Sequence, residues 1–214
     1  MTVQVGVAAP RLRPRTAIAV LVLLAAGAVW RPVPTAAAPK APNFGPIIEG
    51  YAKYDPQDEC KPKPKPGVVA FRDLVLQEYP ITSSMGISRA CDIGGTSEHK
   101  EGRAWDWGVK AYKPFQKAMA RDLLDWLFAI DRFGHRHAMA RRLGIMYLVW
   151  NKRIWGAWGP GWETYCVMKP SGLCRDPDSG AVRDPHRDHM HFSFSWKGAR
   201  MNSTFWNPEN SFPS

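Results

Sequence analysis

Apolar residues in the middle of the chain recur at the period of a helix. Between Lys113 and Gly134 they follow one another mostly at steps of three and four, which is typical of a helix with one face toward a core. Pro114 stands where helices begin and Gly134 where they end. We therefore expect a long helix over 113–134 and shorter helices over 67–78 and 135–144. The apolar face of the long helix consists of Phe115, Met119, Leu123, Trp126, Leu127 and Ile130.

Three segments have the patterns of strands. Residues 145–151 are short, β-branched and aromatic. In 103–109 and 189–196, apolar and polar side chains alternate, so each strand has an apolar face for the core and a polar face for a site. The polar faces carry Asp106 in the first of these strands and His189, His191, Ser193 and Ser195 in the second. The apolar faces carry Trp105, Trp107 and Val109, and Met190, Phe192, Phe194 and Trp196.

Residues 1–38 have the order of a secretory signal peptide, with basic residues followed by an apolar run and small residues. The alternative is an uncleaved anchor, but the apolar run of about 15 residues is shorter than the roughly 20 needed to span a bilayer. We expect a secreted or cell-wall-associated protein with no membrane span after signal removal. Pro39 would be a poor first residue, so the cleavage position stays open.

The remaining chain divides by composition. Residues 39–66 are rich in Pro and Lys and predict a linker. Residues 67–214 are enough for one domain with its own core, which we expect to be monomeric. An even number of cysteines in an exported chain favours disulfides. Of the three possible connectivities we expect Cys60–Cys91 and Cys166–Cys174. The sequence contains no CxxC pair, so it gives no indication of a zinc site built from cysteines.

The net charge is +10, and removal of residues 1–38 leaves 25 basic and 19 acidic residues, or +6. Such a chain is attracted to polyanions, and outside a cell these include teichoic acids and the carboxylates of peptidoglycan. Nucleic acid is disfavoured as a partner because the basic residues are scattered and form no stripe interleaved with aromatic residues.

Three residues of the polar strand faces and the adjoining turn are candidate metal ligands. His99, Asp106 and His191 offer the nitrogen and oxygen donors that zinc accepts, and three protein ligands leave a fourth position open. Gly102 would allow a tight turn after His99. Ser97 would hold the loop through its hydroxyl group.

Two motifs resemble those of a known enzyme superfamily. The pattern SxHxxGxAxD resembles the first metal motif of zinc peptidases related to D-Ala-D-Ala carboxypeptidases. The pattern HxxHxH resembles the second motif of the penicillin-insensitive murein endopeptidases, and exported actinobacterial members carry both. The resemblance covers Thr82 to Trp196. The first pattern comprises Ser97, His99, Gly102, Ala104 and Asp106, and the second His186, His189 and His191.

The resemblance implies an α+β fold, shared with lysostaphin-type enzymes and the hedgehog domain, in which helices cover one face of a small antiparallel sheet. It also implies that His99, Asp106 and His191 bind one Zn²⁺ per chain. His189 would then polarise water or move its proton, and His186 would hydrogen-bond the oxyanion or the leaving group.

One position departs from the carboxypeptidase pattern, which has a Glu three residues before the last histidine. Asp188 stands there, and its shorter side chain leaves two candidates for the base, His189 (preferred) and Asp188. Alternatively, Asp188 orients a histidine. Arg89 is the nearest match for the family's charge-stabilising arginine, with a surface salt bridge as the alternative reading.

The segment between the motifs holds three tryptophans among glycines. We expect Trp155 to pack on the sheet, and Trp158 or Trp162 to line a substrate groove. Together these features predict an exported zinc peptidase that hydrolyses an amide bond in peptidoglycan or its peptide fragments; which bond is cut stays open. The alternatives are a non-catalytic, metal-containing wall-binding domain and an extracellular metal-dependent phosphoesterase or nuclease.

Overall fold

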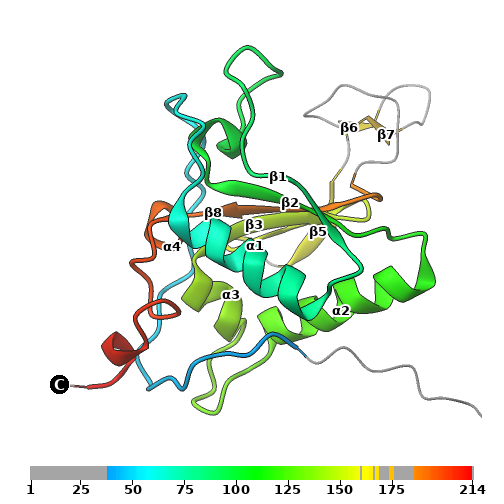
Figure 1. Ribbon diagram of the computed structural model, residues 1–214. Coiled ribbons are helices and arrows are strands. Elements are labelled where there is room, and N and C mark those ends of the chain that lie inside the picture. Colours follow the sequence, from blue (N-terminus) through cyan, green and yellow to red (C-terminus); the bar gives the residue numbers. More distant parts are fainter. Residues whose placement is uncertain (1–37, 160, 166, 169–173, 176–185, 214) are drawn as a thin grey trace, which may run out of the picture. The chain divides into compact units, whose positions relative to one another are not determined.

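The computed structural model describes residues 38–159, 161–165, 167–168, 174–175 and 186–213. It has an α+β fold built on a six-stranded antiparallel sheet with the strand order β1-β2-β8-β3-β4-β5 (Figure 1). The strands of this sheet are β1 (Ser83–Gly86), β2 (Ala104–Gly108), β3 (Ile145–Trp150), β4 (Arg153–Gly156), β5 (Trp162–Thr164) and β8 (Met190–Phe194). A separate pair is formed by β6 (Val167–Met168) and β7 (Cys174–Arg175).

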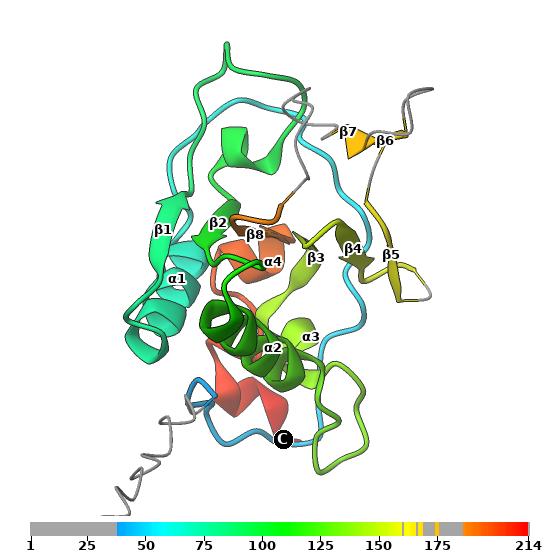
Figure 2. The same cartoon turned by 90° about the vertical axis from the view of Figure 1, so that its right-hand side faces the viewer.

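Helices cover one face of this sheet, as expected (Figures 1 and 2). They are α1 (Pro66–Glu78), α2 (Pro114–Phe128), α3 (Ala138–Leu143) and α4 (Trp196–Ala199), with single 3₁₀ turns at η1 (Glu98–Glu101) and η2 (Pro208–Ser211). In the part of the chain that the structure describes, no helix is both long and apolar enough to cross a membrane.

The core lies between the helices and the apolar faces of the central strands. Trp105 and Trp107 of β2 are completely buried, which confirms the face predicted from the alternation. From α1, the ring of Phe71 meets the rings of Trp105, Phe192 and Phe194 edge-on, with centroids 5.2–5.8 Å apart. The opposite face of β2 and β8 is therefore left to polar side chains.

The long helix was predicted with the wrong end, because α2 stops at Phe128 rather than at Gly134. The backbone N–H groups of Phe133 and His135 donate to Oδ1 of Asp131, each at 3.0 Å. An aspartate whose side chain accepts hydrogen bonds from nearby backbone N–H groups in this way favours a turn over a helix. Ile130, which we placed on the apolar face, is 65% exposed beyond the helix end.

The segment 39–66 is not a free linker, contrary to its composition. Phe44 is buried in the core. The buried Arg142 guanidinium donates to the carbonyl oxygens of Gly45 and Ile47 at 3.0 and 2.9 Å. The content of Pro and Lys is typical of a linker, but the domain holds carbonyl groups of this segment and the ring of Phe44, so the segment forms part of the folded unit.

A buried ion pair fixes the second half of this segment beside β2. Arg103 Nε lies 2.6 Å from Oε2 of Glu101, and both side chains are fully buried. The other oxygen of Glu101 accepts the backbone N–H of Asp58 at 3.0 Å, and Arg103 also donates to the carbonyl of Asp55. A buried charge is tolerated only when it is paired and hydrogen-bonded in this way.

The disulfide predicted between Cys60 and Cys91 is present. It joins the 39–66 segment to the loop that precedes η1. Of the second predicted pair, Cys166–Cys174, the first residue lies outside the described residues.

Replacing both Cys60 and Cys91 with serine should lower the free energy of unfolding by about 3–4 kcal/mol, because the bridge closes a loop between residues 31 apart in sequence. Urea titration of the wild type and the double variant measures this change. Reduction of the wild type should lower the free energy of unfolding at least as much, because it breaks this bridge and any second one. Equal unfolding midpoints in all three samples would refute the prediction.

Candidate metal centre

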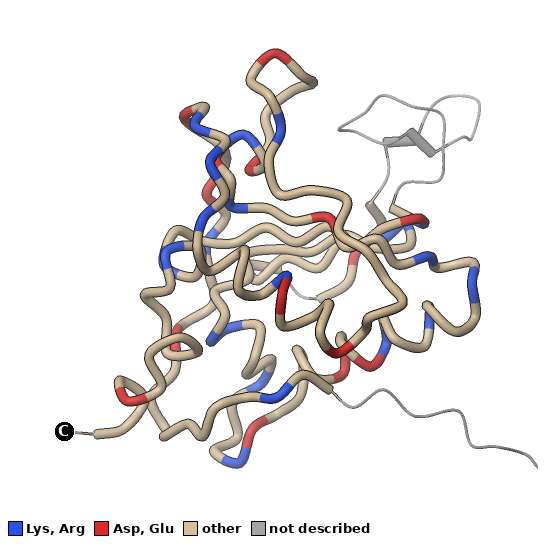
Figure 3. Tube along the Cα trace, in the orientation of Figure 1, with Lys and Arg blue, Asp and Glu red and all other residues tan. Residues whose placement is uncertain are grey.

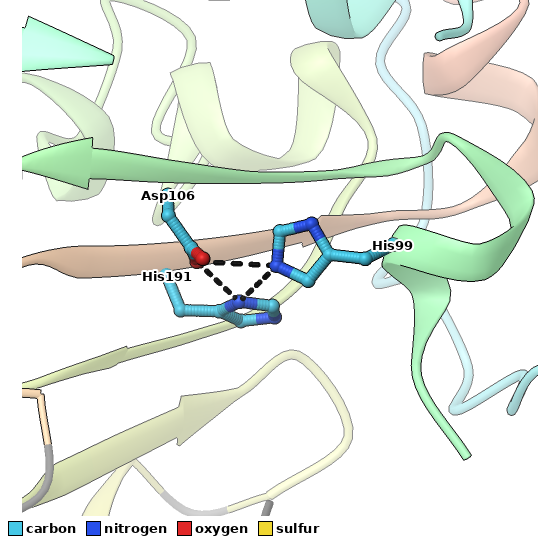
Figure 4. A group of neighbouring side chains, drawn as sticks. All are labelled: His99, Asp106 and His191. Carbon is cyan, nitrogen blue, oxygen red and sulfur yellow. Dashed lines mark hydrogen bonds and ion pairs between the residues drawn. The ribbon is translucent and has the colours of Figure 1, made fainter. Parts of the chain in front are cut away.

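Three elements bring the predicted ligands together on the polar face of the sheet. His99 comes from η1, Asp106 from β2 and His191 from β8 (Figure 4). Asp106 and His191 are directly opposite each other in the antiparallel register of β2 and β8. The two tryptophans beside Asp106 hold its strand by packing on the other face.

The three donor atoms are close enough to share one ion. Asp106 Oδ1 lies 2.9 Å from His191 Nδ1 and 3.2 Å from His99 Nε2, and the two nitrogens are 3.2 Å apart. Four ligands at about 2.0–2.1 Å in a tetrahedron lie about 3.3 Å from one another. The spacing of the triad therefore fits a divalent metal site in which three corners are protein atoms.

The hydrogen bond of His99 orients its ring toward the triad. Nδ1 lies 2.8 Å from the carbonyl oxygen of Ile87. A carbonyl can only accept, so Nδ1 carries a proton. In the neutral ring the lone pair of Nε2 therefore faces Asp106 and His191, whereas in the protonated ring Nε2–H donates to Asp106. Metal-binding histidines are commonly fixed by such an outer hydrogen bond.

In the metal-free triad, the electrostatic surroundings favour the ionised form of Asp106 and the protonated form of His99. Burial acts to raise the pKa of Asp106, but the hydrogen bonds from His191 and His99 outweigh it and hold that pKa well below its usual value. Burial acts to lower the pKa of His99, and the hydrogen bond and charge of Asp106 reverse this, so that the net shift is upward. A metal ion would displace protons from these imidazoles when it binds.

Two further histidines of the HxxHxH motif lie beside the triad. His189 Nε2 is 3.8 Å from Oδ1 of Asp106, and the ring of His186 is 4.5 Å from that of His189 and 5.9 Å from that of His191. Burial, with the positive charges of His191 and His189, lowers the pKa of His186 to about 2. His186 is therefore neutral at physiological pH.

Asp188 points to His189 rather than to the triad. Its Oδ1 lies 2.8 Å from His189 Nδ1, and its side chain is 56% exposed. This is the geometry of a carboxylate that orients a histidine. Because Nδ1 of His189 is bound to Asp188, Nε2 is the ring nitrogen of His189 that faces Asp106.

Gly102 has the predicted role and Ser97 does not. Gly102 adopts a left-handed conformation with φ of 66° directly after η1, and a Cβ there would lie 2.0 Å from the carbonyl oxygen of Lys63. Ser97 is buried at the start of η1, where its hydroxyl makes no capping hydrogen bond. Its backbone N–H donates to Oε1 of Gln57 at 2.8 Å, so the loop is held through the main chain.

Arg89 lies near His99. Its backbone N–H donates to the carbonyl of His99 at 3.2 Å, and its positive charge acts to lower the pKa of His99. A cation in this position can interact with an anionic group that approaches the triad.

The two candidate groove tryptophans lie on opposite faces of the sheet. Trp162 of β5 pairs with the buried Trp155 and contacts Phe128 of α2, with ring centroids 6.0 Å apart, so its ring lies on the helix side of the sheet, opposite the metal ligands. Trp158 is 49% exposed and lies 5.9 Å from the ring of Tyr147, which stacks on His191 at 5.5 Å. Trp155 packs on the sheet, as predicted.

Sequence reasoning missed three polar residues around His191, namely Glu98, Tyr147 and Ser193. Ser193 shares the polar face of β8 with His191, so the alternation of that strand contained a signal for it. Glu98 and Tyr147 come from other elements, and no local pattern links them to His191.

Fold and site together define an α+β domain with a candidate metal centre of two histidines and one aspartate. The family model for the VldE C-terminal domain matches residues 60–170, and the chain belongs to this family. The match includes His99 and Asp106 and ends before His191. Among curated proteins and among solved structures, none matches the chain.

Proposed function

We propose that this protein is an exported zinc-dependent peptidase that hydrolyses an amide bond in peptidoglycan peptides. The observation that carries the proposal is the convergence of His99 Nε2, Asp106 Oδ1 and His191 Nδ1 within 3.2 Å of one another. One carboxylate and two imidazoles suit zinc, and three protein ligands leave a position for water or substrate, as catalytic zinc requires.

Each polar group around the triad has a role in this reaction. When bound, zinc supplies Lewis-acid chemistry toward a carbonyl and water. His189, oriented by Asp188, accepts the proton of the attacking water at Nε2 and passes it to the leaving amine. His186 is neutral and hydrogen-bonds the oxyanion or leaving group, and Arg89 adds positive charge.

Location and charge support a cell-wall substrate. The disulfide between Cys60 and Cys91 is typical of proteins in oxidising compartments outside the cytosol. Without residues 1–38, the chain carries an excess of six positive charges. Figure 3 shows basic and acidic residues interspersed over the described part of the domain, which suits general retention on an anionic polymer.

Digestion of purified muropeptides with zinc-loaded protein, followed by mass spectrometry, tests the proposal. We expect a new product whose mass corresponds to hydrolysis of one amide bond, and no product when a chelator is added. The substrate set should include free stem peptides and cross-linked dimers, because these separate carboxypeptidase from endopeptidase activity. If zinc binds but no muropeptide mass changes between about pH 5 and pH 9, where a histidine base is active, the peptidase proposal fails, and the wall-binding domain and the phosphoesterase are the alternatives that remain.

Trp158 should contribute to substrate binding. The exposed ring lies 5.1 Å from that of Tyr54 and continues the row of rings that begins at His191 and Tyr147. Replacement of Trp158 by alanine should raise KM by about 2- to 10-fold, as expected for loss of one aromatic contact, and leave kcat nearly unchanged. Steady-state kinetics on the cleaved muropeptide measure both constants.

Phe115→Ala is the matched control, since Phe115 is similarly exposed (44%) but lies on α2. It should leave KM at the wild-type value. Equal KM values for the wild type and the Trp158 variant would remove Trp158 from the substrate site.

A further inference from the structure

A groove on the helix side of the sheet has no part in the reaction above. It lies between α2 and the part of the sheet formed by β3, β4 and β5, and its volume is about 270 Å³. This is the size of a site for one small ligand. Its lining combines aromatic rings with charged and amide side chains, which is the composition of a ligand site rather than of a packing defect.

One stripe of α2 forms the first wall of the groove. Arg121, Leu124, Asp125 and Phe128 follow one another at steps of three and four residues, so they share one face of the helix. The stripe therefore presents one basic, one acidic and two apolar side chains to the groove.

The hairpin of β3 and β4, together with β5, forms the second wall. Trp150 and Arg153 are directly opposite each other in the register, and Trp162 is opposite Trp155, so all four project to the helix side. The guanidinium carbon of Arg153 lies 5.5 Å from the ring centroid of Trp162, and Nη2 of Arg153 donates to the Trp162 carbonyl at 3.2 Å. A cation is thus held beside an aromatic ring in the lining.

Polar groups of this lining are available to a ligand. In the described part of the chain, the side chains of Arg121 and Asp125 form no hydrogen bond or ion pair. Trp150 is only 6% exposed, and its buried Nε1–H has no hydrogen-bond partner among the described residues. Buried donors in native proteins are nearly always satisfied, by water or a bound molecule where the protein supplies no acceptor.

The chemistry of the lining specifies the ligand. The exposed guanidinium groups of Arg121 and Arg153 can donate to a carboxylate or a phosphate. Asp125 and Asn151 can accept hydrogen bonds from hydroxyl groups. The ring of Trp162 offers apolar surface to the C–H face of a sugar. An anionic group, hydroxyl groups and a ring face are together the features of an anionic saccharide.

We propose that this groove is a second binding site, which takes a saccharide unit that carries a carboxylate or a phosphate. The groove lies on the opposite face of the sheet from the metal triad, so it holds such a unit without occupying the metal centre. The proposal goes beyond the proposed hydrolysis and depends neither on the metal nor on which bond is cut.

Titration of the metal-free protein with sugars, followed by the indole ¹H–¹⁵N signals, tests the proposal. The probes are N-acetylmuramic acid, which carries a carboxylate, N-acetylglucosamine-1-phosphate, and neutral N-acetylglucosamine. An anionic sugar should shift the signals of Trp150 and Trp162 and bind at least about 10-fold more tightly than the neutral sugar, because a hydrogen bond to a charged group is added. The anionic sugar that binds more tightly distinguishes a carboxylate from a phosphate source.

Replacement of both Arg121 and Arg153 with alanine should weaken binding of the anionic sugar by about 10- to 100-fold. The matched control replaces Arg136 and Arg200, which removes the same charge from two exposed positions outside the groove. The control should keep the wild-type affinity. If the double variant does not fold, Arg121→Ala serves instead, since the Arg121 side chain is exposed on α2.

The absence of any shift at Trp150 and Trp162, or equal affinity for the neutral sugar, would overturn the proposal. So would an equal loss of affinity in the groove variant and the control, because that result indicates only general attraction of charge. The titrations need no metal. Absence of zinc binding would therefore count against the proposed function while the groove is still decided.

Discussion

Replacement of Asp106 by alanine should lower zinc affinity by more than about 100-fold. Asp106 is the only anion of the triad, and its Oδ1 lies within 3.2 Å of both ligand nitrogens. Loss of an outer hydrogen-bond partner alone commonly costs 10- to 100-fold in metal affinity, so loss of a ligand should cost more. Competition titration with a chromophoric zinc chelator measures the affinity.

The same substitution should also change the pH dependence of the metal-free protein. The pKa of Asp106 is lower in the folded than in the unfolded chain, so its carboxylate stabilises the fold above the unfolded pKa of about 4. This stabilisation is lost as the pH falls through the folded pKa. The Asp106→Ala protein should therefore be less stable at neutral pH and lose less stability on acidification.

Asp188→Ala is the control for zinc binding, since Asp188 is a nearby aspartate that contacts His189 and not the triad. It should bind zinc as the wild type does. Wild-type affinity in the Asp106 variant would show that the ion, if bound, lies elsewhere.

Replacement of His189 by alanine should abolish most hydrolysis and leave zinc in place. Its Nε2 is 3.8 Å from Asp106 Oδ1, beside the triad but outside the set of closely spaced donor atoms. Removal of a general base typically lowers kcat by about 10²- to 10⁴-fold. Rates of muropeptide cleavage and zinc content by atomic absorption, measured on the same preparation, give both values.

The Asp188→Asn variant separates the two candidate bases. If His189 is the base and Asp188 only orients it, the loss of kcat should be much smaller than in His189→Ala. A larger loss in Asp188→Asn would assign the base to Asp188. A His189 variant with wild-type kcat would exclude His189 from proton transfer.

Local patterns were sufficient to predict the elements that carry the triad. The alternation around Asp106 and His191 fixed which face of each strand is apolar, because burial of tryptophan and phenylalanine side chains dominates the packing of a strand. The role of Gly102 was also predictable from the local sequence. A tight turn with a positive φ beside a backbone carbonyl leaves few alternatives to glycine.

Long-range contacts account for what the sequence did not reveal. Residues 39–66 have the composition of a linker, yet they are held by Arg103, Glu101 and Arg142, whose partners lie far away in the chain. Trp162 was assigned to a groove because its glycine-rich context suggested a loop. Its side chain faces the helices because it pairs in register with the buried Trp155.

Anomalous diffraction at the zinc edge, from crystals of the zinc-loaded protein, tests the central claim most directly. The account predicts one peak per chain, about 2.0–2.2 Å from His99 Nε2, Asp106 Oδ1 and His191 Nδ1, with a non-protein fourth ligand. A peak at any other site, or a fourth protein ligand closing the coordination shell, would contradict it.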